Sequence, residues 1–148
     1  MRGSLFSAKA EYACIAMLEL AARHGDPQPI RLKTIADAHG IPKRFLVQIL
    51  LQLKGAGLIA STRGASGGYH LAGQPDTITL ADIIGVIDRS DATTAPRQTS
   101  GIANTSLGRT LRGVWTEILD AQQRVLETTT LADLVQRSQA SFDLIYQI

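Results

Sequence analysis

The 148-residue sequence has few of the residues that build covalent or metal-held frameworks. It contains one cysteine, Cys14, which excludes a disulfide within the chain and every motif that needs several cysteines. Its three histidines, His24, His39 and His70, lack the three- or four-residue spacing of metal ligands on a helix. We therefore expect no metal, no cofactor and a fold held together by an apolar core.

Long apolar runs are also missing. The longest apolar stretches, residues 13–22 and 45–53, are interrupted by Glu19 and Gln48 and are too short to cross a bilayer. No apolar segment followed by a small-residue cleavage site stands near the N-terminus. We therefore expect no membrane span, no secretory signal and a location in the cytoplasm.

Positive charge is concentrated in the first half of the chain. Residues 1–74 contain nine Lys and Arg against four Asp and Glu, a net +5, whereas residues 75–148 contain six against nine, a net −3. The basic half is the candidate for contact with a polyanion. No Ser-His-Asp arrangement and no pair of buried carboxylates can be argued from the sequence, so we do not expect an enzyme.

Three helices are predicted in the first half. In residues 8–23 apolar side chains recur every three or four positions, which indicates one buried helix face. A short helix over about residues 33–39 is followed by a third that Pro42 opens and that runs to Gly55 or Gly57. Two helices with so short a turn between them predict a helix-turn-helix.

A glycine-rich hairpin is predicted directly after the third helix. Residues 58–62 and 69–72 have the composition of short strands, and residues 63–68 form the tip between them. This is where the wing of a winged helix-turn-helix lies, and a tip with small side chains lets the backbone approach a narrow groove. Two other interpretations stay open: an ordinary surface hairpin, and a phosphate-binding loop, although the lysine of a Walker loop is missing.

The second half predicts a dimerisation helix. Residues 79–82, Thr-Leu-Ala-Asp, have capping-box spacing and start a helix to about Asp88, and a polar loop follows over residues 89–105. From Ser106 to Leu126 apolar residues alternate in steps of four and three, which indicates a seam that packs on a partner helix. The seam comprises Leu107, Leu111, Val114, Ile118, Ala121 and Val125, with Trp115 beside it as a packing anchor or, less favoured, a ligand contact.

The end of the chain is predicted less fully. Thr-Leu-Ala-Asp recurs at residues 130–133, where we interpret it as a separate cap that starts another short helix. Residues 142–148 alternate apolar and polar positions, so a strand and a docked extension both stay open. The expected fold is mainly α with a small β-hairpin wing. Its divisions are a winged helix-turn-helix domain over residues 1–88, a variable loop of the sensor type over 89–105, and a dimerisation helix with a C-terminal extension over 106–148.

Several short motifs accompany this order of elements. They are Glu11-Tyr12-Ala13, Ile35-Ala36 with Gly40-Ile41, Gln48 with residues 53–58, Arg63-Gly64 with Gly67-Gly68-Tyr69, and Ile78-Thr79-Leu80. Together they resemble the Rrf2 family of bacterial winged helix-turn-helix transcription regulators over residues from about 7 to 137. The resemblance implies a homodimer that binds a two-fold operator in double-stranded DNA, as a repressor or an activator, with the third helix in the major groove and Arg63 in the minor groove.

The DNA-contacting residues follow from this resemblance and from their chemistry. Lys43 and Arg44, at the start of the third helix, are suited to phosphates, and Gln48 is suited to an adenine edge. Many family members have a polar or acidic residue in place of Val47, which predicts apolar contact with thymine methyl groups here. The full set comprises Lys43, Arg44, Val47, Gln48 and Leu51 on the helix, and Arg63, Gly64, Ser66, Gly67, Gly68 and Tyr69 on the wing.

The sequence departs from the family in its loop. Members that bind an iron-sulfur cluster carry three cysteines before the long helix, but residues 90–106 contain none, so we expect no such cluster. Glu11 falls near the place where some relatives supply an acidic ligand, and we expect it to be a solvated glutamate instead. Cys14 is expected to fill the core, with a redox sensor as the less favoured interpretation.

One further alternative keeps the fold without DNA. Val47 and Leu51 could then contact a protein partner, as in a dimeric protein-interaction module. The sequence identifies neither the operator nor a small-molecule effector.

Overall fold

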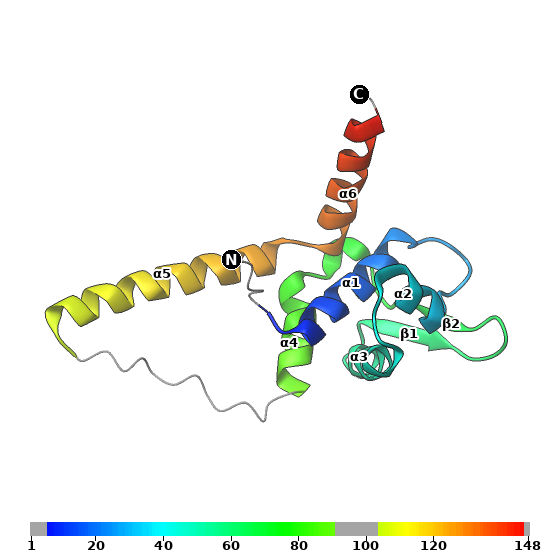
Figure 1. Ribbon diagram of the computed structural model, residues 1–148, viewed down its shortest axis with the longest axis horizontal. Helices are drawn as coiled ribbons and strands as arrows, with labels where there is room; N and C mark the ends of the chain where they lie inside the picture. The colour runs from blue at the N-terminus through cyan, green and yellow to red at the C-terminus, as the bar shows by residue number, and fades with distance from the viewer. Residues whose placement is uncertain (1–5, 91–103, 147–148) are drawn as a thin grey trace.

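The structure, a computed structural model, describes residues 6–90 and 104–146 (Figure 1). This part of the chain contains six α-helices and one antiparallel β-hairpin, so the mainly helical fold with a small wing is confirmed. The elements in chain order are α1 (Ala8–Ala22), α2 (Leu32–His39), α3 (Lys43–Gly55), β1 (Ile59–Thr62), β2 (Gly68–Leu71), the 3₁₀ turn η1 (Pro75–Thr77), α4 (Leu80–Ser90), α5 (Ser106–Thr128) and α6 (Leu131–Tyr146).

Helix α1 is the centre of the core. It packs against α2, α3, α4, α6 and β2. Its buried face contains Ala10, Ala13 and Ala16, whose small side chains allow close helix packing, together with Met17 and Leu20. The partner side chains from α3 and α4 are fully buried aliphatic residues, namely Leu46, Ile49, Leu50, Leu53, Ile83 and Ile87. These contacts confirm the apolar face predicted for residues 8–23.

Helices α2 and α3 form the predicted helix-turn-helix. Gly40 adopts a left-handed backbone conformation with φ of 65°, which ends α2, and the amide of Ile41 donates to the carbonyl of Ala36 at 3.0 Å. Pro42 then caps α3, where its missing amide costs no hydrogen bond. The inward side chains of α2 are Ile35 and Ala36, as the sequence predicts.

The hairpin follows α3 directly. Its register pairs Ile59 with Leu71 and Thr62 with Gly68. The tip closes through a hydrogen bond of 3.0 Å from the amide of Gly67 to the carbonyl of Gly64. A Cβ atom at Gly67 would collide with the carbonyl oxygen of Thr62, so glycine at this position is required by the turn itself.

A third extended segment joins the hairpin. Ile30 forms an isolated antiparallel bridge with Tyr69, with amide-to-carbonyl distances of 2.9 and 2.7 Å in the two directions. The sequence did not predict this pairing, because the residues before α2 have no strand periodicity.

The two Thr-Leu-Ala-Asp segments lie side by side. In each, the threonine hydroxyl accepts from the aspartate amide, and the aspartate carboxylate accepts from the threonine amide, at 2.9–3.2 Å. Thr79 and Thr130 are paired in an antiparallel bridge, which places the starts of α4 and α6 together. The interpretation of two separate caps was therefore incomplete, because each cap is also a partner of the other.

The end of the chain corrects two predictions. The helix that begins at Leu131 is not short, and it continues to Tyr146, so the strand considered for residues 142–148 is wrong over residues 142–146. The alternation of apolar and polar residues there occurs within α6, a helix that packs on α1.

Helix α4 also extends two residues past the predicted Asp88. Of the loop expected over 89–105, residues 91–103 lie outside the described part.

Long elements leave the compact part of the molecule in two directions. Figure 1 shows α5 extending away from the body with its C-terminal turns near α4, whereas α6 rises from the other end of the same junction. None of the described helices is long and apolar enough to cross a membrane.

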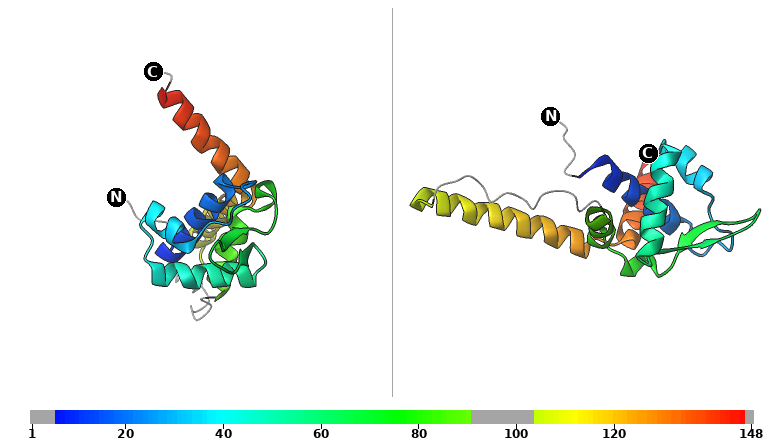
Figure 2. Two further views of the ribbon diagram at one scale, coloured as in Figure 1. Left: turned by 90° about the vertical axis from the view of Figure 1, so that its right-hand side faces the viewer. Right: turned by 90° about the horizontal axis from the view of Figure 1, so that it is seen from below.

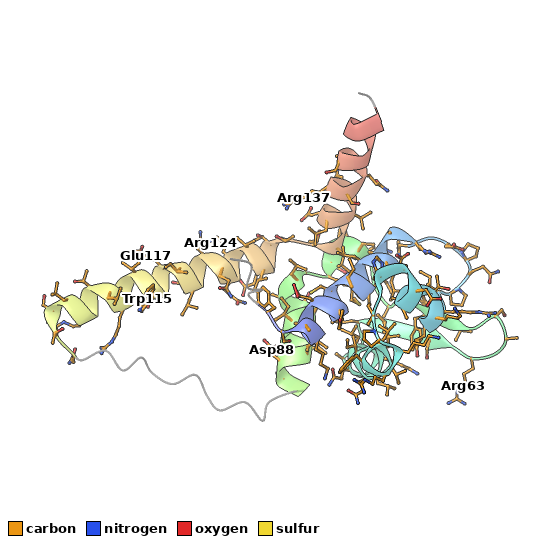
Figure 3. All side chains as sticks on the ribbon, viewed as in Figure 1. Arg63, Asp88, Trp115, Glu117, Arg124 and Arg137 are labelled. Carbon is orange, nitrogen blue, oxygen red and sulfur yellow. The ribbon has the colours of Figure 1, made fainter. Side chains whose placement is uncertain are left out.

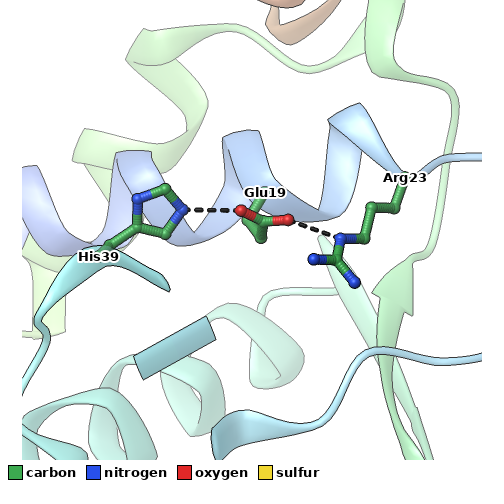
Figure 4. A network of polar contacts seen from close by, with 3 residues as sticks. All are labelled: Glu19, Arg23 and His39. Atoms are coloured by element: carbon green, nitrogen blue, oxygen red, sulfur yellow. Dashed lines mark hydrogen bonds and ion pairs between the residues drawn. The ribbon is translucent and has the colours of Figure 1, made fainter. Parts of the chain in front are cut away.

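One polar network fixes α2 on α1. The carboxylate of Glu19 accepts from Nε of Arg23 at 2.6 Å and lies 2.8 Å from Nε2 of His39 (Figure 4). Burial by itself would raise the pKa of Glu19, but the hydrogen bonds from His39 and Arg23 and the charge of Arg23 bring that pKa below its ordinary value. The folded state is therefore stabilised by the ionised carboxylate.

This network predicts a pH-dependent contribution to stability. Because the pKa of Glu19 is lowered on folding, its contribution is present above the ordinary value of 4.5 and is lost as the pH falls through the folded-state value. Glu19→Gln should lower the free energy of unfolding by about 1 kcal/mol at neutral pH. Urea denaturation at neutral pH and at two acidic pH values, with Glu117→Gln on α5 as the control, would measure the difference. A loss that stays constant down to acidic pH would contradict this assignment.

Candidate nucleic-acid interface

The outer face of α3 combines cations with apolar side chains. Leu46, Ile49, Leu50 and Leu53 point into the core, and the helical period leaves the intervening side chains in solvent. All five residues predicted on this helix are exposed, namely Lys43, Arg44, Val47, Gln48 and Leu51. The exposed fractions of Val47 and Leu51 are 44% and 62%, so apolar surface lies beside the cationic start of the helix.

Phe45 flanks this face and was not predicted. It is 38% exposed, and the guanidinium carbon of Arg44 lies 4.9 Å from the centroid of its ring. Phe45 is part of the apolar stretch of residues 45–53, but it lies on a different side of α3 from the buried Leu46. A helical projection restricted to residues 43–51 would have found it.

The wing residues divide into two groups. Arg63, Gly64 and Ser66 lie at the exposed tip, and Gly64 has a positive φ of 111° that favours glycine. Gly67 is buried inside the turn, and Tyr69 is half-buried where β2 meets Ile30. Gly68 lies against the backbone of Ile30. The six residues predicted on the wing thus all lie within residues 63–69, but only Arg63, Gly64 and Ser66 are exposed.

Arg63 and α3 lie on one side of the molecule. Figure 2 shows from below that α3 runs along this side and that the hairpin extends outward from it. The Arg63 side chain points to the same side in Figure 3. The structure therefore brings together the two elements that the sequence predicted to act jointly.

The cations of this face form no ion pair among the described residues. Within the described residues, none of Lys43, Arg44 and Arg63 forms an ion pair, whereas Lys33 of α2 pairs with Asp37 at 2.5 Å. The hydrogen bond from Lys33 is the main cause that lowers the pKa of Asp37; desolvation opposes it, and the charges of Lys33 and Lys43 contribute less. Positive charge on α3 and on the wing tip is thus available to an anionic partner.

Helix α5 carries a second exposed surface. Every residue of the predicted seam and its flanking tryptophan is exposed on the single chain, namely Leu107, Leu111, Val114, Trp115, Ile118, Ala121 and Val125. Leu119 is 46% exposed as well and was missed, because it falls outside the four-three spacing. Figure 3 shows Trp115 on the part of α5 that extends away from the body.

The remaining chemically active residues are scattered. Cys14 is half-buried on α1, where burial chiefly, with a smaller effect of the Glu11 charge, raises the pKa of its thiol to about 11. His24 and His70 are exposed, and His39 contacts Glu19. Nowhere in residues 6–90 and 104–146 do three His, Cys, Asp or Glu side chains gather in a way that could hold a metal ion.

Known proteins share both the sequence and this arrangement. The profile of the Rrf2 family, described as iron-dependent transcriptional regulators, matches residues 6–137. The HTH-type transcriptional regulator CymR of Bacillus subtilis is 38% identical over 128 residues, which cover 86% of this chain and 87% of that protein. The HTH-type transcriptional regulator IscR of Aliivibrio salmonicida is 41% identical over 88 residues, covering 59% of this chain and 52% of that protein.

Solved structures agree with these relatives. The structure of CymR, the global cysteine regulator of B. subtilis, superposes with a TM-score of 0.77 at 36% identity, covering 91% of this chain and 98% of that one. IscR of T. potens superposes with a TM-score of 0.74 at 33% identity, covering 94% and 91%. This chain, with its helix-turn-helix, its glycine-tipped wing and its long projecting helix, belongs to the Rrf2 family of DNA-binding transcriptional regulators.

Proposed function

We propose that this regulator acts as a homodimer that places α3 in the major groove of its operator and Arg63 in the adjoining minor groove. The observation that carries the proposal is the shared side of α3 and Arg63, with three cations that form no ion pair among the described residues. An α-helix fits the width of the major groove. A guanidinium on a thin tip is attracted by the negative potential of a narrow minor groove.

Each exposed residue of α3 has a distinct role in this proposal. Lys43 and Arg44, at the N-terminal end of the helix, contact phosphates, where the positive end of the helix dipole adds to their charge. Gln48 offers the paired donor and acceptor that match an adenine edge. Val47 and Leu51 contact thymine methyl groups, and this use of their exposed apolar surface distinguishes the proposal from a protein-interaction module.

A second copy of the chain covers the seam of α5. Seven large apolar side chains on one projecting helix would be costly to leave in water, and the four-three spacing of the seam suits packing on an identical helix. A two-fold dimer then presents two α3 helices and two wings to a two-fold operator.

The donor set does not fit an iron-sulfur cluster. The only cysteine of the sequence is Cys14 on α1, and the raised pKa of its thiol disfavours the thiolate that would bind iron. Residues 91–103 contain neither cysteine nor histidine. We therefore propose that regulation proceeds without a cluster held by the loop, and that Cys14 is a packing residue.

Binding to DNA should weaken steeply with salt. Two copies of Lys43, Arg44 and Arg63 supply six phosphate or groove contacts, for which affinity falls by about a thousandfold between about 50 and 200 mM salt. The probe is a duplex selected by the purified protein from a random-sequence pool, and fluorescence anisotropy gives Kd. Arg63→Ala should weaken binding by about 1–3 kcal/mol.

Arg137→Ala on α6 is the matched control, because it removes the same charge far from α3 and the wing (Figure 3). Equal losses from the two substitutions would contradict the role given to Arg63. Failure to select any duplex, combined with capture of a defined protein by the α3 face, would favour the protein-interaction module.

The seam should hold the dimer together. Ile118→Asp buries a carboxylate in the proposed interface and should weaken dimerisation by at least about 2 kcal/mol. Thr116→Asp, on the opposite face of α5, should leave the dimer intact. Sedimentation equilibrium at micromolar concentration would measure both, with circular dichroism as the test of folding. A wild-type protein that is monomeric under these conditions would refute the dimer.

Cys14 should react slowly with alkylating agents. A pKa of about 11, against an ordinary 9.0, leaves about a hundredfold less thiolate at pH 8, and burial hinders access further. Iodoacetamide labelling of the folded protein should therefore be at least about a hundredfold slower than labelling in denaturant. Because the sequence has no other thiol, mass spectrometry reports this site alone. Comparable rates in the two states would restore the redox-sensor interpretation.

A further inference from the structure

The segment just before α2 holds the wing at two places. On strand β2, Ile30 pairs with Tyr69, the partner of Ser61 in the hairpin, through the two backbone hydrogen bonds described above. At the tip of the wing, a terminal guanidinium nitrogen of Arg31 donates to the carbonyl of Ala65, a residue 34 positions further along the chain. The first residue of the helix-turn-helix region is thereby connected to the outermost part of the hairpin.

No other local role accounts for the direction of the Arg31 side chain. Arg31 is the N-cap residue of α2, but its side chain makes no capping hydrogen bond. It is exposed and does not contribute to the core. Within the described residues, the hydrogen bond that the Arg31 side chain makes is the one to the carbonyl of Ala65.

The tip has little else to hold it. The last backbone pair of the hairpin is Thr62 with Gly68. In the tip that this pair encloses, we find one backbone hydrogen bond, from the amide of Gly67 to the carbonyl of Gly64. Gly68 packs so closely on the segment before α2 that a Cβ atom there would lie 2.5 Å from the carbonyl oxygen of Ile30. The hairpin is therefore seated against residues 30–31, and only Arg31 extends this support to the tip.

We propose that Arg31 is a positioning residue for DNA binding. It fixes Ala65 and so holds Arg63, two residues earlier, in the orientation that enters the minor groove. Restricting the tip before binding reduces the conformational entropy lost on binding. This inference rests on the proposed groove contact of Arg63, but its structural part, the restraint of the tip, can be measured without DNA.

The first experiment uses limited proteolysis of the full chain in the absence of DNA. Trypsin cleaves after Arg63, and cleavage requires the tip to leave its restrained conformation. Arg31→Met keeps the length of the side chain and removes the donor, so cleavage at Arg63 should accelerate about fivefold, the ratio supplied by one hydrogen bond of ordinary net strength. Lys33→Met is the matched control, since it removes an exposed cation two residues away without contact to the wing.

Two outcomes of the proteolysis experiment decide whether Arg31 restrains the tip. Faster cleavage in Arg31→Met than in Lys33→Met, with unchanged thermal unfolding, supports the restraint. Equal cleavage rates in the two variants and the wild type overturn the proposal, whatever the variants do to DNA binding.

The second experiment is a double-mutant cycle on the selected duplex. If Arg31 acts through Arg63, Arg31→Met weakens binding in the wild type but has little effect in an Arg63→Met background, and the salt dependence of Kd in Arg31→Met stays that of the wild type. Additive losses with a reduced salt slope would mean that Arg31 contacts a phosphate directly, and would overturn its positioning role. If the wild type binds no duplex, the proposed function fails, and the proteolysis result alone decides whether Arg31 restrains the tip.

Discussion

The close packing of α1 is the constraint on which the rest of the fold depends. Three alanines on its buried face let α3 and α4 approach it, and α6 and β2 pack on other parts of the same helix. A larger side chain at Ala13 or Ala16, both fully buried, would push these elements apart. Because α3 and the hairpin are both seated on α1, their relative orientation, and with it the shared side of α3 and Arg63, follows from this one helix face.

Local patterns predicted most of the fold. The three-four periodicity of α1 and α3, the glycine after α2 and the capping boxes of α4 and α6 are short-range signals that tertiary contacts reinforce. What the sequence could not predict depends on contacts between distant residues. The Ile30–Tyr69 bridge and the pairing of the two caps have no local signature, and the alternation near the C-terminus misled because a docked helix can tolerate it.

The candidate interface shows the same division. Exposure of Lys43, Val47, Gln48 and Leu51 follows from the positions that the core leaves free on α3, so periodicity alone was sufficient. Periodicity also placed the seam of α5, and only Leu119 escaped it. The contact of Arg31 was not predicted because its partner lies in the hairpin, and nothing in the residues around it distinguishes it from other surface arginines.

The bridge between Thr79 and Thr130 makes one rigid joint of the starts of α4 and α6 and the end of α5. From this joint α5 projects over 23 residues, a length of about 34 Å at 1.5 Å per residue. A tilt of α5 by about 5° at the joint displaces the far end of the helix by about 3 Å. In a dimer built on α5, the distance between the two DNA-reading surfaces would therefore depend on the backbone pairing of two threonines as well as on the packing of the helix seam.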